Sequence, residues 1–323
     1  MALAANDDMK RLPIPRDARY VAWKGILLAA GWLALAALPA ATGPAPKSGT
    51  RALSLQGLPV ELIFRSFQPG EAILAVLKDI PPAHQIILKV RDHKYVLGGA
   101  GKGAPTFALI GIDVAAKAEP LDMGVIEEKA DGSIASFEEE LPVEPKEFSR
   151  RRFYVEEAML NPPPQEQERV ARESNLVQSV FDIFTSEWLG TGNFMSPLPD
   201  REPFPNFGQL RIYNKTRQAV HAGVDIAAPW GTPALASNAG RVVLASSLYL
   251  SGKTVIIDHG RGVFTFYCHF SKLLVKRGDW VKKGQPIAKV GNTGRSTGPH
   301  LHWAVRILDV RVDPFSLVSL PLE

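Results

Sequence analysis

Short apolar runs separated by turn-rich pieces fill most of the chain and predict a mainly β protein. In the first half these runs are seven to ten residues long, which suits strands better than helices. They lie at 58–67, 71–78, 85–91, 106–114 and 151–157. Gln68-Pro69-Gly70, Pro81-Pro82 and the glycine-rich 98–103 separate them. This spacing predicts a β-sandwich accessory domain over residues 53–157.

A second β-rich region begins near residue 195, after a segment with helical periodicity. Prolines at 162–164 suit a helix start, and residues 165–189 place their apolar side chains on one stripe. The stripe consists of Val170, Val177, Val180, Phe181, Phe184 and Trp188. We therefore expect a helical linker over 162–190 that packs between domains. The strand-like runs 240–247, 253–260, 262–270, 285–291 and 300–307 then predict a β-sandwich domain over 195–318.

The N-terminal region has the pattern of an export signal. Residues 25–41 carry no charge and follow five basic residues, Lys10, Arg11, Arg16, Arg19 and Lys24. This pattern predicts a signal peptide or a signal anchor over 25–42, with residues 1–24 as a basic cytoplasmic N-terminus. The chain is then exported to the periplasmic or cell-wall side. If the segment is retained, it contacts the cytoplasmic membrane.

Charge and cysteine content narrow the classes of site and partner. The net charge is +4, but residues 200–323 hold 16 Lys and Arg against 8 Asp and Glu, which gives +8 there and −4 elsewhere. A basic domain favours a polyanionic partner, either nucleic acid or an anionic cell wall. Cys268 is the one cysteine, so the chain has no internal disulfide and no cysteine-rich zinc site.

Five of the seven histidines fall between residues 221 and 302, and three of them belong to two close pairs, His221 with Asp225 and His300 with His302. His221 and Asp225 are four apart, so they share one face of an extended strand, and Gly223 leaves space between them. His300 and His302 likewise share a face, while Leu301 and Trp303 point to the core. The spacing thus directs imidazoles and a carboxylate to a common point.

This donor set suits a catalytic zinc ion, which takes about three protein ligands and keeps one open position. His221, Asp225 and one of His300 or His302 complete the set, and the remaining histidine can act on water or substrate. Tyr267 and His269 add a third strand and are expected on one face. His84 and His93 stand alone, which is typical of surface or structural histidines.

These segments resemble the lysostaphin-like (LytM-type) zinc metalloendopeptidases. The resemblance covers about 120 residues: HAGVDIAAPWGTPALA (221–236), GRVV (240–243), VIIDHGRG (255–262), FYCHFS (266–271), GDWVKKGQPIAKVGNTGRSTGPHLHW (278–303) and DP (313–314). It implies a grooved β-sandwich with one zinc ion that cleaves the peptide stems of bacterial peptidoglycan. By the motif, His221, Asp225 and His302 are the zinc ligands. His269 and His300 are the catalytic histidines that do not bind the metal.

Several residues near these motifs have two interpretations. Arg211 and Asn214 line the groove or belong to a surface turn, and Tyr267 donates to the oxyanion or is structural. Cys268 is expected to face away from the metal. His259, in an Asp-His-Gly turn, is interpreted as a hairpin cap.

Three other functions compete with the enzyme. A non-catalytic LytM-type regulator that activates another cell-wall hydrolase would lack some ligands, whereas all the expected ones are present here. A biotinyl- or lipoyl-type carrier shares the GDWVKKGQPIAKVG pattern but needs an acceptor lysine turn that the sequence lacks. A nucleic-acid binder is disfavoured by the export signal and the absence of a binding motif. The sequence identifies no protein partner.

Overall fold

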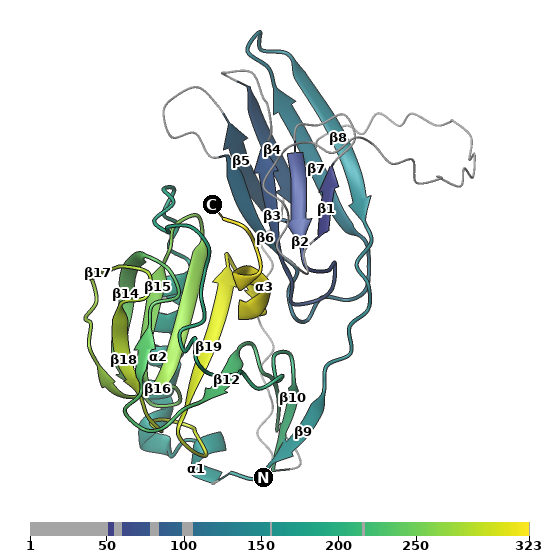
Figure 1. Ribbon diagram of the computed structural model, residues 1–323. Helices are drawn as coiled ribbons and strands as arrows, with labels where there is room; N and C mark the ends of the chain where they lie inside the picture. The colour runs from purple at the N-terminus through teal and green to yellow at the C-terminus, as the bar shows by residue number, and fades with distance from the viewer. Residues whose placement is uncertain are drawn as a thin grey trace. The chain divides into compact units, whose positions relative to one another are not determined.

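The computed structural model describes residues 51–54, 60–77, 84–98, 106–155, 157–214 and 217–322. The predicted signal segment 25–42 and the N-terminus 1–24 lie outside these residues. Among the described residues, no helix combines the length and apolar character needed to cross a membrane. The strands and helices are labelled in Figure 1, and the mainly β fold class predicted from the sequence is confirmed.

The accessory domain consists of two four-stranded antiparallel sheets. One has the order β1 (Arg51–Ser54), β2 (Val60–Phe64), β3 (Ala72–Leu77) and β6 (Phe107–Gly111). The other has the order β5 (His93–Gly98), β4 (Gln85–Val90), β7 (Leu121–Glu128) and β8 (Ile134–Leu141). Their facing side chains form one apolar cluster that includes Leu62, Ile73, Ile86, Leu88 and Leu97, so the two sheets form a sandwich.

The last predicted strand of this domain belongs elsewhere. β9 (Arg150–Phe153) leaves the sandwich and pairs in parallel with β10 (Leu210–Tyr213), which pairs antiparallel with β11 (Arg217–Val220). A strand pattern in the sequence identifies an extended segment but not its partner. The assignment of residues 151–157 to the accessory sheets is therefore wrong.

The linker is helical over a shorter range than its apolar stripe predicts. α1 (Glu157–Leu160) is followed by α2 (Pro164–Phe181), and residues 182–189 are not helical. Instead, the backbone nitrogen of Arg261 donates to Thr185 O at 2.6 Å, and Leu189 N donates to His259 O at 2.8 Å. Contacts with the second domain thus override helical periodicity after Phe181.

The C-terminal domain is a nine-stranded sheet system with its own core. The main order is β12 (Val224–Ala227), β19 (His300–Ile307), β16 (Val263–Leu273), β15 (Gly252–Asp258), β14 (Gly240–Leu248) and β17 (Trp280–Val281). β13 (Pro233–Leu235) pairs with β18 (Pro286–Val290), β18 also pairs with β16, and β20 (Val310–Val312) pairs with β19. Trp303, Tyr267 and Phe270 are fully buried in its core.

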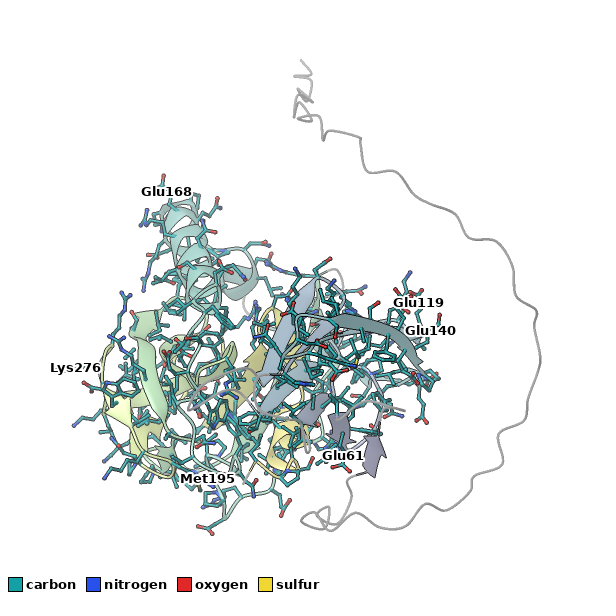
Figure 2. All side chains as sticks on the ribbon, turned by 90° about the horizontal axis from the view of Figure 1, so that it is seen from above. Glu61, Glu119, Glu140, Glu168, Met195 and Lys276 are labelled. Atoms are coloured by element: carbon teal, nitrogen blue, oxygen red, sulfur yellow. The ribbon has the colours of Figure 1, made fainter. Side chains whose placement is uncertain are left out.

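Two contacts attach other elements to this domain. The end of α2 places Val180 and Phe181 against Val243, Leu244 and Phe264, so the last turn of the helix packs on the sheet. Figure 1 labels α2 and the strands of this domain. The short helix α3 (Pro314–Val318) meets the accessory domain, where Ser316 Oγ accepts from Ala72 N at 3.0 Å. Exposed charged side chains such as Glu119, Glu140 and Lys276 cover the periphery (Figure 2).

Candidate active site

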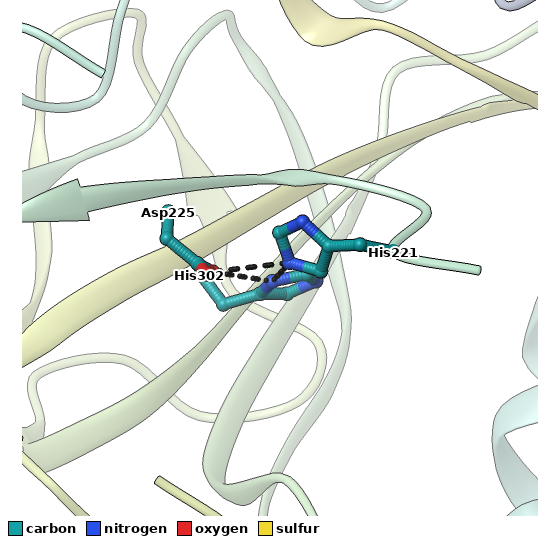
Figure 3. A group of neighbouring side chains, drawn as sticks. All are labelled: His221, Asp225 and His302. Carbon is teal, nitrogen blue, oxygen red and sulfur yellow. Dashed lines mark hydrogen bonds and ion pairs between the residues drawn. The ribbon is translucent and has the colours of Figure 1, made fainter. Parts of the chain in front are cut away.

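Three potential ligand atoms meet at one end of β12 and β19 (Figure 3). His221 Nε2 lies 2.9 Å from His302 Nδ1 and 3.1 Å from Asp225 Oδ1. His302 Nδ1 lies 3.0 Å from the same carboxylate oxygen. The three atoms form an almost equilateral triangle, and we refer to His221, Asp225 and His302 as the metal group. The structure thus brings together the three residues that the sequence resemblance assigns as metal ligands.

The register of two strands brings together two of the three residues. Asp225 on β12 is the cross-strand partner of His302 on β19, so both side chains project to the same face. The neighbours of His302, Leu301 and Trp303, are fully buried on the other face, as their alternation predicts. The expectation that His300 and His302 share one side of their strand is likewise met by the alternating burial of β19.

His221 reaches the group by a different route from the one expected. It lies after β11 and before β12, so it does not share a strand with Asp225. Backbone hydrogen bonds position it: His221 N donates to Gln209 O at 3.0 Å, and His221 O accepts from Gly208 N at 2.8 Å. The expectation that Gly223 leaves room for its neighbours is met: a Cβ at this position would lie only 2.8 Å from His302 Cε1 and would clash with that ring.

The donor set fits a divalent metal ion. A tetrahedron of ligands around zinc at about 2.0–2.1 Å has edges of roughly 3.3–3.4 Å, slightly longer than the distances observed here. His221 Nδ1 donates to Asn206 O at 2.8 Å, which leaves Nε2 unprotonated and free to bind a cation. Asp225 Oδ2 accepts from Arg211 at 2.6 Å and from Asn206 Nδ2 at 3.0 Å, which leaves Oδ1 for the metal.

Two further histidines lie beside the triangle. His300 Nδ1 donates to Gly298 O at 2.8 Å, and its Nε2 lies 3.6 Å from Asp225 Oδ1. His269 Nδ1 donates to Thr293 O at 2.8 Å, and its ring centroid is 4.8 Å from that of His300. Both rings therefore carry their proton on Nδ1 when neutral. Their Nε2 atoms remain available as proton acceptors.

Known proteins are similar to parts of this chain. The model of the peptidase family M23 matches residues 219–314. The C-terminal domain is a peptidase family M23 domain. The family resemblance expected from the sequence is thus confirmed for this part of the chain.

Individual relatives match about a third of the chain. Peptidoglycan DD-endopeptidase ShyA of Vibrio cholerae is 46% identical over 99 residues, which are 30% of this chain and 23% of that protein. DD-carboxypeptidase/endopeptidase Mpg of Neisseria meningitidis is 45% identical over 102 residues, 32% of this chain and 23% of that protein. The matched part thus spans about a quarter of these relatives.

One solved structure is similar beyond the M23 domain. A crystal structure assigned to peptidase M23 from Pseudomonas aeruginosa superposes with a TM-score of 0.55 and 27% identity. The superposition covers 79% of this chain and 96% of that one. The similarity therefore includes a large part of the region that precedes the M23 domain.

A β-bulge in the M23 domain changes the orientation of three neighbouring residues on β16. His269 has a φ of 68°, and the pairing of β15 with β16 shifts register between Lys253 and Val255. Tyr267 and His269 therefore do not share a face, contrary to the expectation from strict alternation. The extra residue of the bulge is what turns the His269 ring toward His300 and His302.

Tyr267 is a core residue and not an oxyanion donor. Its side chain is fully buried, and its hydroxyl oxygen accepts from Ser237 N at 2.9 Å. The expected direction of Cys268 is also wrong, because Cys268 pairs with His302 across the sheet and so projects to the face of the metal group. Burial and the Asp225 charge raise the pKa of the Cys268 thiol well above its usual value, so the thiol stays protonated.

Of the two residues on the β10–β11 hairpin that were expected to line the groove, only Arg211 does so. Arg211 lies at the site, where it forms the ion pair with Asp225. Asn214 lies in the turn, and its side chain accepts from Val155 N at 3.0 Å and donates to Val155 O at 2.8 Å. Asn214 thus holds the segment after β9 and does not line the groove, as the surface-turn interpretation predicted.

His259 agrees with its interpretation as a structural residue. It is fully buried, Nδ1 lies 2.7 Å from Ala239 O and Nε2 lies 2.7 Å from Thr265 Oγ1. His84 and His93 lie in the accessory domain, where each pairs with one carboxylate, Glu127 and Asp309 respectively. None of these three belongs to the metal group.

Burial sets the charges in the site. Burial opposes ionisation of Asp225, but the neighbouring His221 and His302 side chains outweigh it and hold its pKa well below the usual range. Burial lowers the pKa of His269 to about 3, with repulsion from His302 and His300 adding to the effect. Burial also lowers the pKa of His302. The group therefore presents one anionic and several neutral ligand atoms at neutral pH, as metal binding requires.

A cleft of about 400 Å³ opens beside the triangle. Its lining includes Asp225, His300 and Arg211, together with three residues that the sequence reasoning missed: Asn206, Arg151 and Phe153. Asn206 contacts both His221 and Asp225. Arg151 and Phe153 come from β9, outside the M23 match. The three consecutive arginines Arg150-Arg151-Arg152 could have drawn attention to this segment. The local sequence does not show that the segment pairs with β10 and so reaches the cleft.

Proposed function

We propose that this protein is an exported zinc metalloendopeptidase that hydrolyses peptide bonds, foremost the crosslinks, of bacterial peptidoglycan. The observation that carries the proposal is the triangle of His221 Nε2, Asp225 Oδ1 and His302 Nδ1, beside two histidines with free Nε2 atoms. The similarity to relatives named peptidoglycan DD-endopeptidases supports the choice of substrate.

Zinc is the metal that suits this donor set best. Two neutral imidazoles and one carboxylate give a site with net positive charge and an open fourth position, as in catalytic zinc sites. A bound zinc ion would supply Lewis-acid activation of water and of the substrate carbonyl. Arg211 and Asn206 hold Asp225 through Oδ2, and Asn206 O fixes the tautomer of His221, so both ligands are oriented by neighbours.

His300 and His269 are proposed to move protons and stabilise charge in the reaction. Their Nε2 atoms are the free basic groups beside the triangle, because backbone carbonyls fix each Nδ1–H. One accepts a proton from the attacking water and returns it to the leaving amine, and the other donates a hydrogen bond to the developing oxyanion when it is protonated. The deep burial of His269 favours its neutral form, which suits the role of proton acceptor.

Export is proposed on the sequence pattern of residues 25–42. A hydrolase of the cell wall must reach the periplasmic or cell-wall side of the cytoplasmic membrane. The uncharged run behind a basic flank provides that route, either as a cleaved signal peptide or as a membrane anchor.

The proposal is tested with purified full-length protein, purified peptidoglycan and mass analysis of the released fragments. We expect zinc to copurify and crosslinked peptides to be cut. Asp225→Ala should lose both zinc and activity, because it removes a ligand. His300→Ala should keep zinc and slow turnover by about 10²–10⁴-fold, the usual contribution of a general acid or base.

The same pair of variants checks the division of roles. Loss of zinc from His300→Ala, with zinc retained by His302→Ala, would reverse the assignment of ligands. A wild-type protein that binds zinc yet releases no fragment from peptidoglycan would refute the enzyme and leave the regulator as the alternative.

A further inference from the structure

One side of the cleft is formed by the paired strands β9 and β10, and this face is rich in arginine and aromatic side chains. In the parallel register of β9 and β10, Arg151 lies beside Arg211 and Phe153 lies beside Tyr213. The guanidinium carbons of Arg151 and Arg211 lie 5.3 Å and 5.2 Å from the centre of the Phe153 ring. The ring thus supports both cations on one surface.

A third cation joins this face from the loop before β19. Arg295 lies over the ring of Tyr213, with its guanidinium carbon 5.3 Å from the ring centre. Burial lowers the pKa of Arg295, and repulsion from Arg217 and Arg211 acts in the same direction. Like charges side by side on neighbouring strands are destabilising unless an anion offsets them.

The protein supplies an anion for one of these cations. Arg211 pairs with Asp225, the single carboxylate among the residues that line the cleft. Arg151 is exposed, and within the described residues neither Arg151 nor Arg295 forms an ion pair with a carboxylate. Arg151 in the cleft and Arg295 over the Tyr213 ring are therefore available to a ligand.

We propose that this face of the cleft is a carboxylate-binding subsite. In it Arg151, with help from Arg295, binds a carboxylate of the peptide substrate close to the scissile amide. The inference rests on the proposed peptidase function and adds to it a substrate class, an acidic peptide. Arg151 comes from β9, so the subsite is supplied by a segment outside the M23 match of residues 219–314.

Geometry limits where that carboxylate lies in the substrate. Arg211 contacts Asp225 Oδ2 at 2.6 Å, while Oδ1 of the same carboxylate belongs to the metal triangle. Arg151 lies one strand further away, which is about 4.8 Å. An extended peptide advances about 3.3–3.6 Å per residue, so the carboxylate lies within a few residues of the scissile bond.

The test uses two synthetic crosslinked peptides that differ in one group. In the first, the carboxylate next to the scissile amide is free, and in the second it is a carboxamide. We expect the full-length protein to cleave the free acid with a kcat/KM about tenfold higher, the size of one charge-assisted hydrogen bond. Raising the salt concentration should reduce this preference, since the site is partly exposed.

Two matched variants on β9 test whether the preference for the free carboxylate comes from the strand face that lines the cleft. Arg151→Gln should reduce the preference to about twofold or less while cleavage of the carboxamide peptide stays within about twofold of wild type. Arg152→Gln removes an exposed arginine from the opposite face of the same strand and should leave the preference unchanged.

The outcomes separate the two proposals. If the wild type cleaves both peptides equally, or if Arg151→Gln slows both to the same extent, the subsite is refuted and the peptidase stands. If the wild type cleaves neither peptide and releases nothing from peptidoglycan, the proposed function is refuted together with the subsite.

Discussion

At the scale of single residues, the chemistry of each histidine is decided by what its other ring nitrogen contacts. Backbone carbonyls of Asn206, Thr293 and Gly298 accept from the Nδ1 atoms of His221, His269 and His300. In all three rings Nε2 is consequently the free atom. His302 is oriented the opposite way and offers Nδ1 to the triangle. One residue type can thus provide both the proposed metal ligands and the proposed proton carriers, because main-chain carbonyls fix the tautomers of His221, His269 and His300.

Gly223 should be indispensable for the metal site. A Cβ at this position would lie 2.6 Å from the carbonyl oxygen of Trp303 and 2.8 Å from His302 Cε1. Gly223→Ala must therefore displace His302 or its strand, and we expect at least about tenfold weaker zinc binding. Competition with a chelator measures this. Gly124→Ala, whose Cβ would meet a side chain at 3.4 Å, is the control. Equal zinc affinity of the Gly223 variant and wild type would contradict the prediction.

His259 should make stability depend on pH. Burial lowers its pKa to about 4, whereas a histidine in the unfolded chain titrates near ~6.5. Between these values the unfolded state binds a proton that the native state does not, so stability falls as the pH drops from 6.5 towards 4.

A variant without the titrating group isolates this effect. Between pH 7 and pH 5 the wild type should lose about 2 kcal/mol more stability than His259→Gln. Urea unfolding at a series of pH values gives both curves, and effects of other groups cancel in their difference. Parallel curves would show that His259 is not responsible.

At the scale of elements, the site residues are brought together by the pairing register of the strands and by a β-bulge, and not by the alternation within single strands alone. The pairing of β12 with β19 places Asp225 opposite His302, residues that are 77 apart in sequence. The bulge at His269 turns a third element toward them. Strand β9 adds Arg151 and Phe153 to the cleft from before the linker helix. Each of these features depends on a pairing between distant segments.

The linker helix should stabilise the M23 domain through its last turn. Phe181 is 8% exposed, its ring lies 5.6 Å from that of Phe264, and Arg306 lies 4.4 Å from its centre. Phe181→Ala should lower the free energy of unfolding by about 3 kcal/mol, because it leaves a cavity between helix and sheet. Urea unfolding followed by tryptophan fluorescence measures this loss.

Leu176 on the same helix provides the control. It is 40% exposed, so Leu176→Ala should cost less than about 1 kcal/mol. Equal losses for the two variants would mean that the helix does not pack on the sheet as described.

At the scale of the whole molecule, the accessory domain is joined to the end of the M23 domain by an ion network around the buried carboxylate of Glu71. Glu71 is 1% exposed and pairs with Arg65 at 2.7 Å and with Lys146 at 3.1 Å. Arg65 also pairs with Asp313 at 2.6 Å. Asp313 caps α3, where its carboxylate accepts from Phe315 N. The similarity to the Pseudomonas aeruginosa structure over 79% of this chain extends the relationship beyond the M23 domain.

Removal of Arg65 should loosen this junction. Arg65→Ala leaves the buried Glu71 carboxylate with Lys146 as its remaining partner and also frees Asp313. We expect a loss of about 2–3 kcal/mol and a thermal unfolding curve that separates into two transitions. Lys117→Ala breaks an exposed pair with Glu119 in the same domain and should change stability by less than about 0.5 kcal/mol. A single, unshifted transition for Arg65→Ala would contradict the role of the network.

The sequence by itself determined the mainly β architecture, the similarity of the C-terminal part to the M23 family and the identity of five residues that the structure brings together. Alternation at His300 and His302 and the spacing of the strand-like runs are local properties, so they can be read without a structure. Residue types also restricted the metal donors. A single cysteine excludes a cysteine-rich zinc site and leaves histidine and carboxylate side chains as the ligands.

Only the tertiary structure decided which strands pair, in which register and where a strand bulges. Those features turned Tyr267 into the core and Cys268 toward the metal face, ended α2 at Phe181 and brought Arg151 into the cleft. The physical reason is that the local pattern fixes which side of a strand is apolar. Pairing free energies between segments far apart in sequence fix which polar groups finally meet.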